Sequence, residues 1–218
     1  MPLSAERPRV AGRRARKLSR SFYARSALKV APDLLGKVLC HVSGGVLTTG
    51  RIVEVEAYLG TADPASHAWR GPTERNRAMF GPPGHVYVYF TYGNHFCMNV
   101  VTGREGVASA VLIRALEPLE GIDLMRRRRG REALGDLTSG PGKLAQALGI
   151  DRAAYGLDLT QAPLWIEDDR LYPPEWLATP RIGISAAIEL PYRFVVAGSP
   201  FVSRRSTGQP RNPPKRMS

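Results

Sequence analysis

The densest run of β-branched and aromatic residues extends from His85 to Val101. Almost every residue before Gly93 in this run has such a side chain, a composition that favours strands. Gly93-Asn94 is a turn dipeptide that tolerates positive φ, so the run predicts a protruding β-hairpin. Three tyrosines crowd its first arm, the last of them at the tip: Tyr87, Tyr89 and Tyr92. Buried tyrosines in a core hairpin would satisfy the same pattern.

A second alternating segment, residues 51–60, carries acidic residues inside an apolar strand. Strict alternation places two sets of side chains on opposite faces of the strand. One face would carry Ile52, Glu54, Glu56 and Tyr58, and the other Val53, Val55 and Ala57. Two carboxylates are costly to bury without partners. For Glu54, a position that faces solvent is as well supported as a buried position with partners. The neighbouring Tyr58 makes Glu56 a candidate base beside an aromatic platform.

Arg114 lies in a third apolar segment, residues 108–118. A charge inside such a strand is costly unless it is paired. We therefore expect Arg114 to pair with Glu56 or Glu54. A purely structural ion pair would explain the same pattern and would not exclude a catalytic role.

The remaining pattern predicts an α+β domain with a curved antiparallel or mixed sheet and flanking helices. Helices are expected in residues 22–35 before Gly36, from Leu119 to Arg129, and in residues 138–150 with Ser139 as the cap. Further strands are expected at residues 37–42, 46–49, 164–167, 181–188 and 192–197. We predict one domain over residues 21–203, between a disordered basic arm (1–20) and a disordered basic tail (204–218).

A long loop, residues 61–84, separates the acidic strand from the hairpin, and loops of this length are usually functional or disordered. It contains His67, more often an ordinary surface histidine than a site residue, and three arginines that fit either a solvated face or phosphate contacts: Arg70, Arg75 and Arg77. Lys143 and the amides beside it would also suit a phosphate. The segment is not a Walker A loop, because Leu144 replaces the required Ser or Thr.

Charge narrows the class of partner. The 218 residues carry 31 Lys/Arg against 19 Asp/Glu, a net charge of +12, which favours nucleic acid. No apolar run reaches the length of a membrane span. Cys40 and Cys97 lie in apolar contexts and are expected to be reduced core residues rather than a disulfide. We expect a cytosolic or nucleoid setting, or the nucleus in a eukaryote; a transit peptide is the alternative for the Arg-rich start.

Four motifs in order resemble the 3-methyladenine (alkyladenine) DNA glycosylase family: R-I-V-E-V-E-A-Y-L-G, R-N-R-A-M-F-G-P-P-G-H-V-Y-V-Y-F-T-Y-G-N-H-F-C-M-N-V, L-I-R-A-L-E-P-L-E-G and S-G-P-G-K-L. The resemblance covers roughly residues 21–203. It implies a single-domain enzyme that flips alkylated or deaminated purines out of duplex DNA and hydrolyses their N-glycosidic bonds, without metal or cofactor. Asn94 and His95 depart from the mammalian pattern at the hairpin tip.

Carried over by position, Glu56 would be the general base that activates water, and Arg114 would help to hold that water and the carboxylate. Tyr92 would fill the gap left by the flipped base. The pocket would be formed by Tyr58, His67, Tyr89 and Asn99, with Asn99 disfavouring the amino group of guanine. We expect DNA backbone contacts from Arg70, Arg75, Arg77, Lys143 and Ser199.

The register of the hairpin tests this interpretation. A two-residue turn places Tyr89 opposite Met98, whereas a three-residue loop ending at His95 places it opposite Asn99, as a shared pocket requires. No lysine stands beside Glu56 in the sequence, which predicts a monofunctional hydrolase, and we expect a monomer. A non-catalytic minor-groove binder and an RNA-binding accessory protein are the alternatives. The sequence does not rank 3-methyladenine, 7-methylguanine, hypoxanthine and ethenoadenine as substrates.

Overall fold

The longest strand, β3 (Val46–Tyr58), lies at the centre of the computed structural model, which describes residues 15–91, 93, 95–171 and 174–203. One edge of β3 pairs with β6 (Ser109–Glu120). The other edge pairs first with β2 (Val38–Ser43) and then, over Glu54–Glu56, with β9 (Arg193–Val196). The acidic part of β3 is therefore bonded to a strand on each side.

The sheet continues outward from β3 in both directions. Its order is β1-β7-β2-β3-β6-β5-β4, and β8 joins through β9. Each of these pairs is antiparallel. The other strands are β1 (Arg16–Lys17), β4 (Val86–Thr91), β5 (His95–Thr102), β7 (Leu164–Asp168) and β8 (Trp176–Thr179). The prediction of a single α+β domain on an antiparallel sheet is confirmed.

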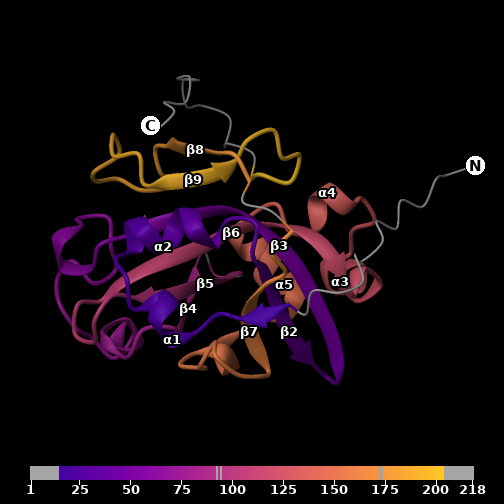
Figure 1. Ribbon diagram of the computed structural model, residues 1–218, viewed down its shortest axis with the longest axis horizontal. Coiled ribbons are helices and arrows are strands. Elements are labelled where there is room, and N and C mark those ends of the chain that lie inside the picture. Colours follow the sequence, from indigo (N-terminus) through magenta and orange to yellow (C-terminus); the bar gives the residue numbers. More distant parts are fainter. Residues whose placement is uncertain (1–14, 92, 94, 172–173, 204–218) are drawn as a thin grey trace, which may run out of the picture.

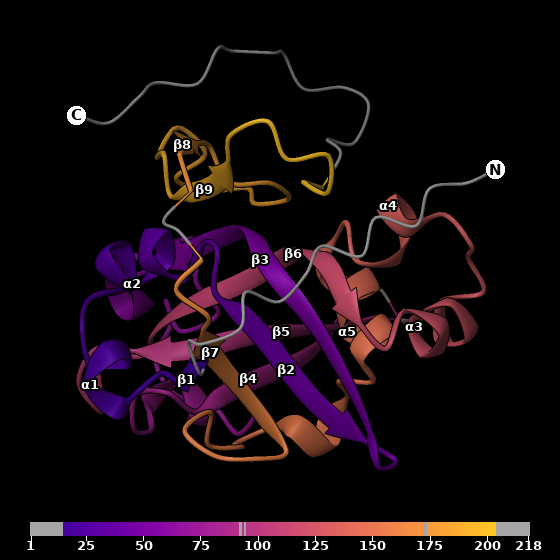
Figure 2. The same ribbon diagram turned by 45° about the vertical axis from the view of Figure 1, so that its right-hand side comes forward.

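The helices gather at two ends of the sheet, with α1 and α2 at one and α3, α4 and α5 at the other (Figures 1 and 2). The helices are α1 (Arg20–Tyr23), α2 (Ala27–Leu34), α3 (Ile122–Arg129), α4 (Leu134–Leu137) and α5 (Pro141–Leu148), with single turns η1 (Gly60–Ala62), η2 (Arg77–Phe80) and η3 (Arg152–Ala154). Within the described residues, no helix is both long enough and apolar enough to span a membrane.

The main core fills one face of the sheet. It joins β3 residues Val55 and Ala57 to apolar side chains of β4, β5 and β6 and to α2 and α5. A smaller apolar cluster lies around Tyr87, Val101 and Ala110, and includes Ala68 from the long loop. Cys40 and Cys97 are free and buried, as predicted.

Several predicted boundaries are wrong, for identifiable physical reasons. Strand β6 runs to Glu120, and α3 starts only after Gly121, which has φ +73° where a Cβ would lie 2.6 Å from the Leu47 carbonyl oxygen. The cap of α5 is Gly140, not Ser139. Residues 181–188 form turns instead of a strand, and β8 was not predicted.

The first described residues differ in part from the expected disordered arm. Arg16 and Lys17 pair with β7, and α1 begins at Arg20. Regular secondary structure is thus present at residues that the sequence assigned to the arm.

The hairpin register is neither of the two predicted. Pairing runs to Thr91 opposite His95, so the connection is three residues long and lies one position earlier than expected. Tyr89 is opposite Cys97, and Tyr87 is opposite Asn99. Because residues two apart on a strand share a face, Tyr89 and Asn99 still point to the same side of the sheet.

Alternation also fails at one point in β3. The β3–β6 register shifts on both sides of Glu54, which leaves Val53 and Arg114 without opposite residues. A bulge adds a residue and reverses the side-chain pattern beyond it. Ile52 therefore lies in the main core with Val55, and not on the face of Glu54 as strict alternation predicted.

Candidate active site

Glu54 is completely buried, so the prediction that it could face solvent is wrong. Its carboxylate accepts hydrogen bonds from Arg114 Nε at 3.0 Å and Arg193 Nε at 2.7 Å. Ser203 adds its backbone N–H at 2.6 Å and its hydroxyl at 2.7 Å. Burial alone raises the pKa of this carboxyl, but Arg114, Arg193 and these hydrogen bonds outweigh burial and lower it.

Glu56 is also fully buried but has a different set of donors. Its Oε2 accepts from the Tyr58 hydroxyl at 2.8 Å and from Arg114 Nη1 at 3.3 Å. Its Oε1 accepts from the backbone N–H of Ile182 at 2.8 Å. The three donors come from β3, β6 and the segment that follows β8, so Glu56 is fixed by three separate parts of the chain.

Arg114 pairs with both acids, whereas the sequence predicted a pair with Glu56 or Glu54. Its position at the register shift of β6 lets one guanidinium reach Glu54 through Nε and Glu56 through Nη1. Burial by itself would lower the pKa of Arg114, but Glu56 and Glu54 outweigh burial and raise it. Arg114 therefore carries its charge throughout the ordinary pH range.

The Tyr58 hydroxyl stays protonated beside this cluster. Burial first, and then the neighbouring Glu56, raises the pKa of Tyr58 well above its usual value. On its other side, the ring lies 4.7 Å from the guanidinium of Arg181. Tyr58 can thus donate to Glu56 while one ring face is held by a cation.

Aromatic side chains continue from the acids along the hairpin. The ring of His67 lies 4.4 Å from that of Tyr89, and Nδ1 of His67 lies 3.0 Å from the Tyr87 hydroxyl oxygen. Burial, with a smaller contribution from Arg75, lowers the pKa of His67, which is therefore neutral at pH 7. His67, which the sequence left as either a surface or a site residue, thus packs beside Tyr87 and Tyr89 and forms with Tyr58 and Tyr89 an aromatic wall.

Pairing across four strands explains why these residues meet. Four residues form a row across strands β4, β5, β6 and β3, each directly opposite the next: Tyr87, Asn99, Leu112 and Glu56. Directly opposite residues point to the same face of an antiparallel sheet. Asn99 is buried, and its amide donates to the Tyr87 carbonyl oxygen at 3.2 Å. The predicted pocket residues and Glu56 thus share one face.

Two arginines near this face were not predicted. Arg181 is completely buried, pairs with both oxygens of Asp63 and donates to the Ala57 carbonyl oxygen at 3.0 Å. Its partner is 118 residues away, so no local pattern marks the pair. Arg193 lies in an apolar strand as Arg114 does, and the argument used for Arg114 would have found it.

The residues predicted to bind the DNA backbone are less buried. Arg70, Arg75 and Arg77 are exposed on the long loop, and Arg77 lies 3.5 Å from Glu74, which is also exposed. Lys143 is half-buried near the start of α5 and contacts the Ser139 hydroxyl at 3.1 Å. Ser199 is half-buried and accepts from the backbone N–H of Phe201. Tyr92 and Asn94 lie outside the described residues.

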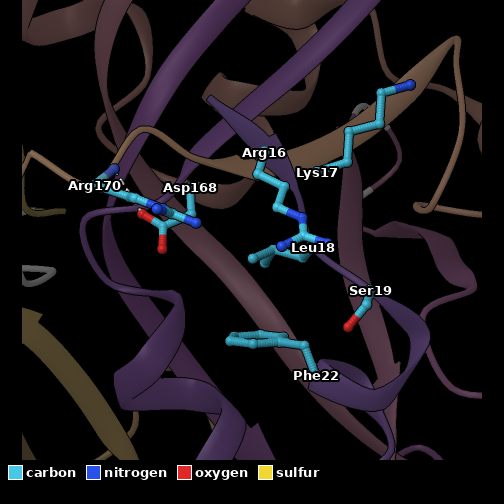
Figure 3. Close-up of a pocket in the computed structure, with 7 residues that line it drawn as sticks. All are labelled: Arg16, Lys17, Leu18, Ser19, Phe22, Asp168 and Arg170. Carbon is cyan, nitrogen blue, oxygen red and sulfur yellow. Dashed lines mark hydrogen bonds between the residues drawn. The ribbon is translucent and has the colours of Figure 1, made fainter. Parts of the chain in front are cut away.

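A surface hollow lies elsewhere, beside β1 and β7. In Figure 3, Arg16 and Leu18 lie to the right of Asp168 and Arg170, and Phe22 lies below Leu18. None of the predicted site residues lines it. Within the described chain, no three His, Cys, Asp or Glu side chains cluster closely enough to hold a metal ion.

Comparisons with known proteins give one family for this chain. The profile of the methylpurine-DNA glycosylase family matches residues 21–200. A Chlorobaculum parvum protein named "Putative 3-methyladenine DNA glycosylase" is 53% identical over 198 residues, 90% of this chain and 95% of its own. Proteins with the same name from Methanoculleus marisnigri and Rhodopseudomonas palustris BisB18 are 53% and 58% identical, over 86% of this chain and 99% and 91% of their own.

Proposed function

This chain belongs to the methylpurine-DNA glycosylase family, and from that premise we propose that it excises alkylated or deaminated purines from duplex DNA by hydrolysis. One observation supports the catalytic assignment above the others. A carboxylate has about four acceptor positions, and Glu54 receives four hydrogen bonds, three of them on Oε1, where both arginines donate. Glu56 receives three from the described residues, which leaves one position on Oε1 for a water molecule.

The chemistry requires the target nucleotide to leave the base stack, because the N-glycosidic bond is inaccessible within it. Cleavage then builds positive charge on the sugar. Glu56 would stabilise that charge and take a proton from the attacking water. Arg114 would hold the Glu56 carboxylate in place. The reaction needs one base and a water, and no lysine is among the described partners of Glu56, which supports a monofunctional mechanism.

The aromatic wall fits an alkylated purine. Such bases carry positive charge, which aromatic faces attract. Tyr58 and Tyr89 would supply those faces, and the neutral His67 would add a ring without electrostatic repulsion. Asn99, on the same face, would disfavour the amino group of guanine. Tyr92, at the hairpin tip, would fill the vacated space in the DNA.

The exposed cations support binding to the DNA backbone. Arg70, Arg75 and Arg77 are on the loop that carries His67, and Lys143 is next to Gly142, where an added Cβ would lie 2.8 Å from His95 on the hairpin. Phosphate contacts from these residues and Ser199 would orient the duplex without reading its sequence. We retain residues 21–203 as the catalytic domain of a monomer, between the two basic segments.

The experiment is base release from duplexes containing single lesions: 3-methyladenine, 7-methylguanine, hypoxanthine or ethenoadenine. We expect E56Q to bind lesion DNA like the wild type while single-turnover release falls by at least about a hundredfold, the scale of acid–base catalysis. E175Q, at an exposed position, is the matched control and should match the wild type.

The other outcomes identify the alternatives. Wild-type protein that binds the duplexes but releases no base would be a minor-groove binder. Displacement by undamaged RNA would indicate an RNA-binding protein. Normal release by E56Q would remove Glu56 from the reaction, and strand nicking by pure protein at an abasic site would contradict the monofunctional mechanism.

A further inference from the structure

The C-terminal end of the described chain reaches the acidic cluster. Ser203 follows the G-S-P-F-V segment and is only 7% exposed. It places both its backbone N–H and its hydroxyl on Glu54, at 2.6 Å and 2.7 Å. Glu54 accepts two further hydrogen bonds, from Arg193 at 2.7 Å and from Arg114 at 3.0 Å. Both bonds from Ser203 are therefore shorter than the bond from Arg114.

The contact matters because Glu54 and Glu56 share one arginine. Arg114 lies 3.0 Å from Glu54 and 3.3 Å from Glu56, so its bond to Glu56 is the longer one. A buried carboxylate that loses a donor must recover the lost interaction or bear a large desolvation cost. Without the Ser203 hydroxyl, Glu54 would draw the Arg114 guanidinium towards itself and away from Glu56.

We propose that Ser203 is a positioning residue for the glycosylase reaction: by satisfying Glu54, it keeps Arg114 shared with Glu56. This inference rests on the proposed function. Ser203 acts through Glu54 and Arg114, and touches neither Glu56 nor the reacting atoms. The C-terminal segment thereby becomes a part of the active site although it lies at the far end of the domain sequence.

Three variants test the proposal. S203A removes the hydroxyl donor and keeps the backbone N–H, whereas S203T keeps both donors. S109A is the matched control, because Ser109 is an equally buried serine whose hydroxyl bonds to the Thr102 carbonyl oxygen at 2.9 Å instead of to an acid. For each variant, single-turnover base release, the Kd for lesion DNA and the melting temperature are measured, and rates are expressed per folded molecule.

We expect S203A to slow base release roughly tenfold, the scale of one hydrogen bond to a charged group, with Kd within about twofold of wild type. S203T should restore most of the rate, and S109A should lower only the melting temperature. In an E54Q background, S203A should have little further effect on the rate of base release, because Ser203 acts through the Glu54 carboxylate, which E54Q has already replaced.

Three results would overturn the proposal: wild-type release by S203A, an equal loss of rate in S109A, or a full additive effect of S203A in the E54Q background. The last measurement also decides the matter if S203T does not fold. None of these results affects the proposed function, which fails if the wild-type protein releases no base; normal release by E56Q would remove only the role of Glu56.

Discussion

Two acids separated by one residue on β3, Glu54 and Glu56, have different hydrogen-bond partners, which supports different roles for them. Glu54 is bonded to two arginines and a serine, and its pKa is lowered despite burial. Such a carboxylate is a fixed negative charge that organises its surroundings. Glu56 keeps an acceptor position among the described residues and has the Tyr58 hydroxyl beside it. At the scale of the residue, therefore, the number of donors separates the structural acid from the candidate base.

Y58F tests the contribution of one of those donors. The substitution removes the 2.8 Å hydrogen bond to Glu56 and keeps the ring next to Arg181. We expect base release to fall about five- to tenfold, since a hydrogen bond to a charged group is lost, while lesion binding changes little. The readout is single-turnover kinetics alongside Kd.

Y192F is the matched control for that prediction. Tyr192 also packs against Arg181, 5.4 Å from its guanidinium, and its hydroxyl has no hydrogen-bond partner in the described part of the chain. Y192F should keep the wild-type rate. Equal rates for Y58F and wild type would show that the Tyr58 hydroxyl does not support the reaction.

At the scale of the element, the sequence predicted much of the framework. Hairpin, acidic strand and buried Arg114 follow from composition and from the cost of unpaired charge. The bulge beside Glu54 does not follow, because period-two alternation contains no signal for an inserted residue. Ile52 was therefore assigned to the wrong face. The strand predicted at residues 181–188 is wrong for another reason: Arg181 is held by Asp63, a residue far away in the sequence.

Close packing of α5 on the hairpin gives an element-scale prediction. A Cβ at Gly142 would lie 2.9 Å from Cβ and 2.8 Å from Cγ of His95, atoms near the backbone that have little freedom to move. We expect G142A to lower the free energy of unfolding by about 1–3 kcal/mol, the range for overpacking, and to weaken lesion binding by displacing the hairpin. Urea denaturation and a DNA titration provide the two readouts.

G135A separates this clash from the effect of adding any methyl group to a helix. An added Cβ at Gly135, inside α4, meets no atom within 4 Å. G135A should leave stability unchanged or raise it by about 0.5–1 kcal/mol, because alanine favours helices over glycine. Equal destabilisation by both variants would contradict the packing argument.

At the scale of the whole molecule, the internal charges are matched and the positive excess lies outside them. Three buried arginines pair with three buried acids around the site: Arg114, Arg181 and Arg193 with Glu54, Glu56 and Asp63. The net charge of +12 is therefore carried by the rest of the molecule, where it can attract phosphates. The composition predicted nucleic acid as the partner, whereas the partners of the buried Arg181 and Arg193 could be identified only from the three-dimensional structure.

Salt dependence measures how much of that excess contacts DNA. Each neutralised phosphate contributes about −0.9 to the slope of log Kobs against log[salt]. Arg70 is exposed on the loop that carries His67, so R70Q should make the slope shallower by about 1 for damaged and undamaged duplexes alike, and leave the saturated single-turnover rate unchanged. Arg16 is on β1, at the opposite end of the sheet order from β4, and R16Q should keep the wild-type slope. An unchanged slope for R70Q would remove Arg70 from the interface, whereas an equal loss for R16Q would mean that the duplex contacts both ends of the sheet.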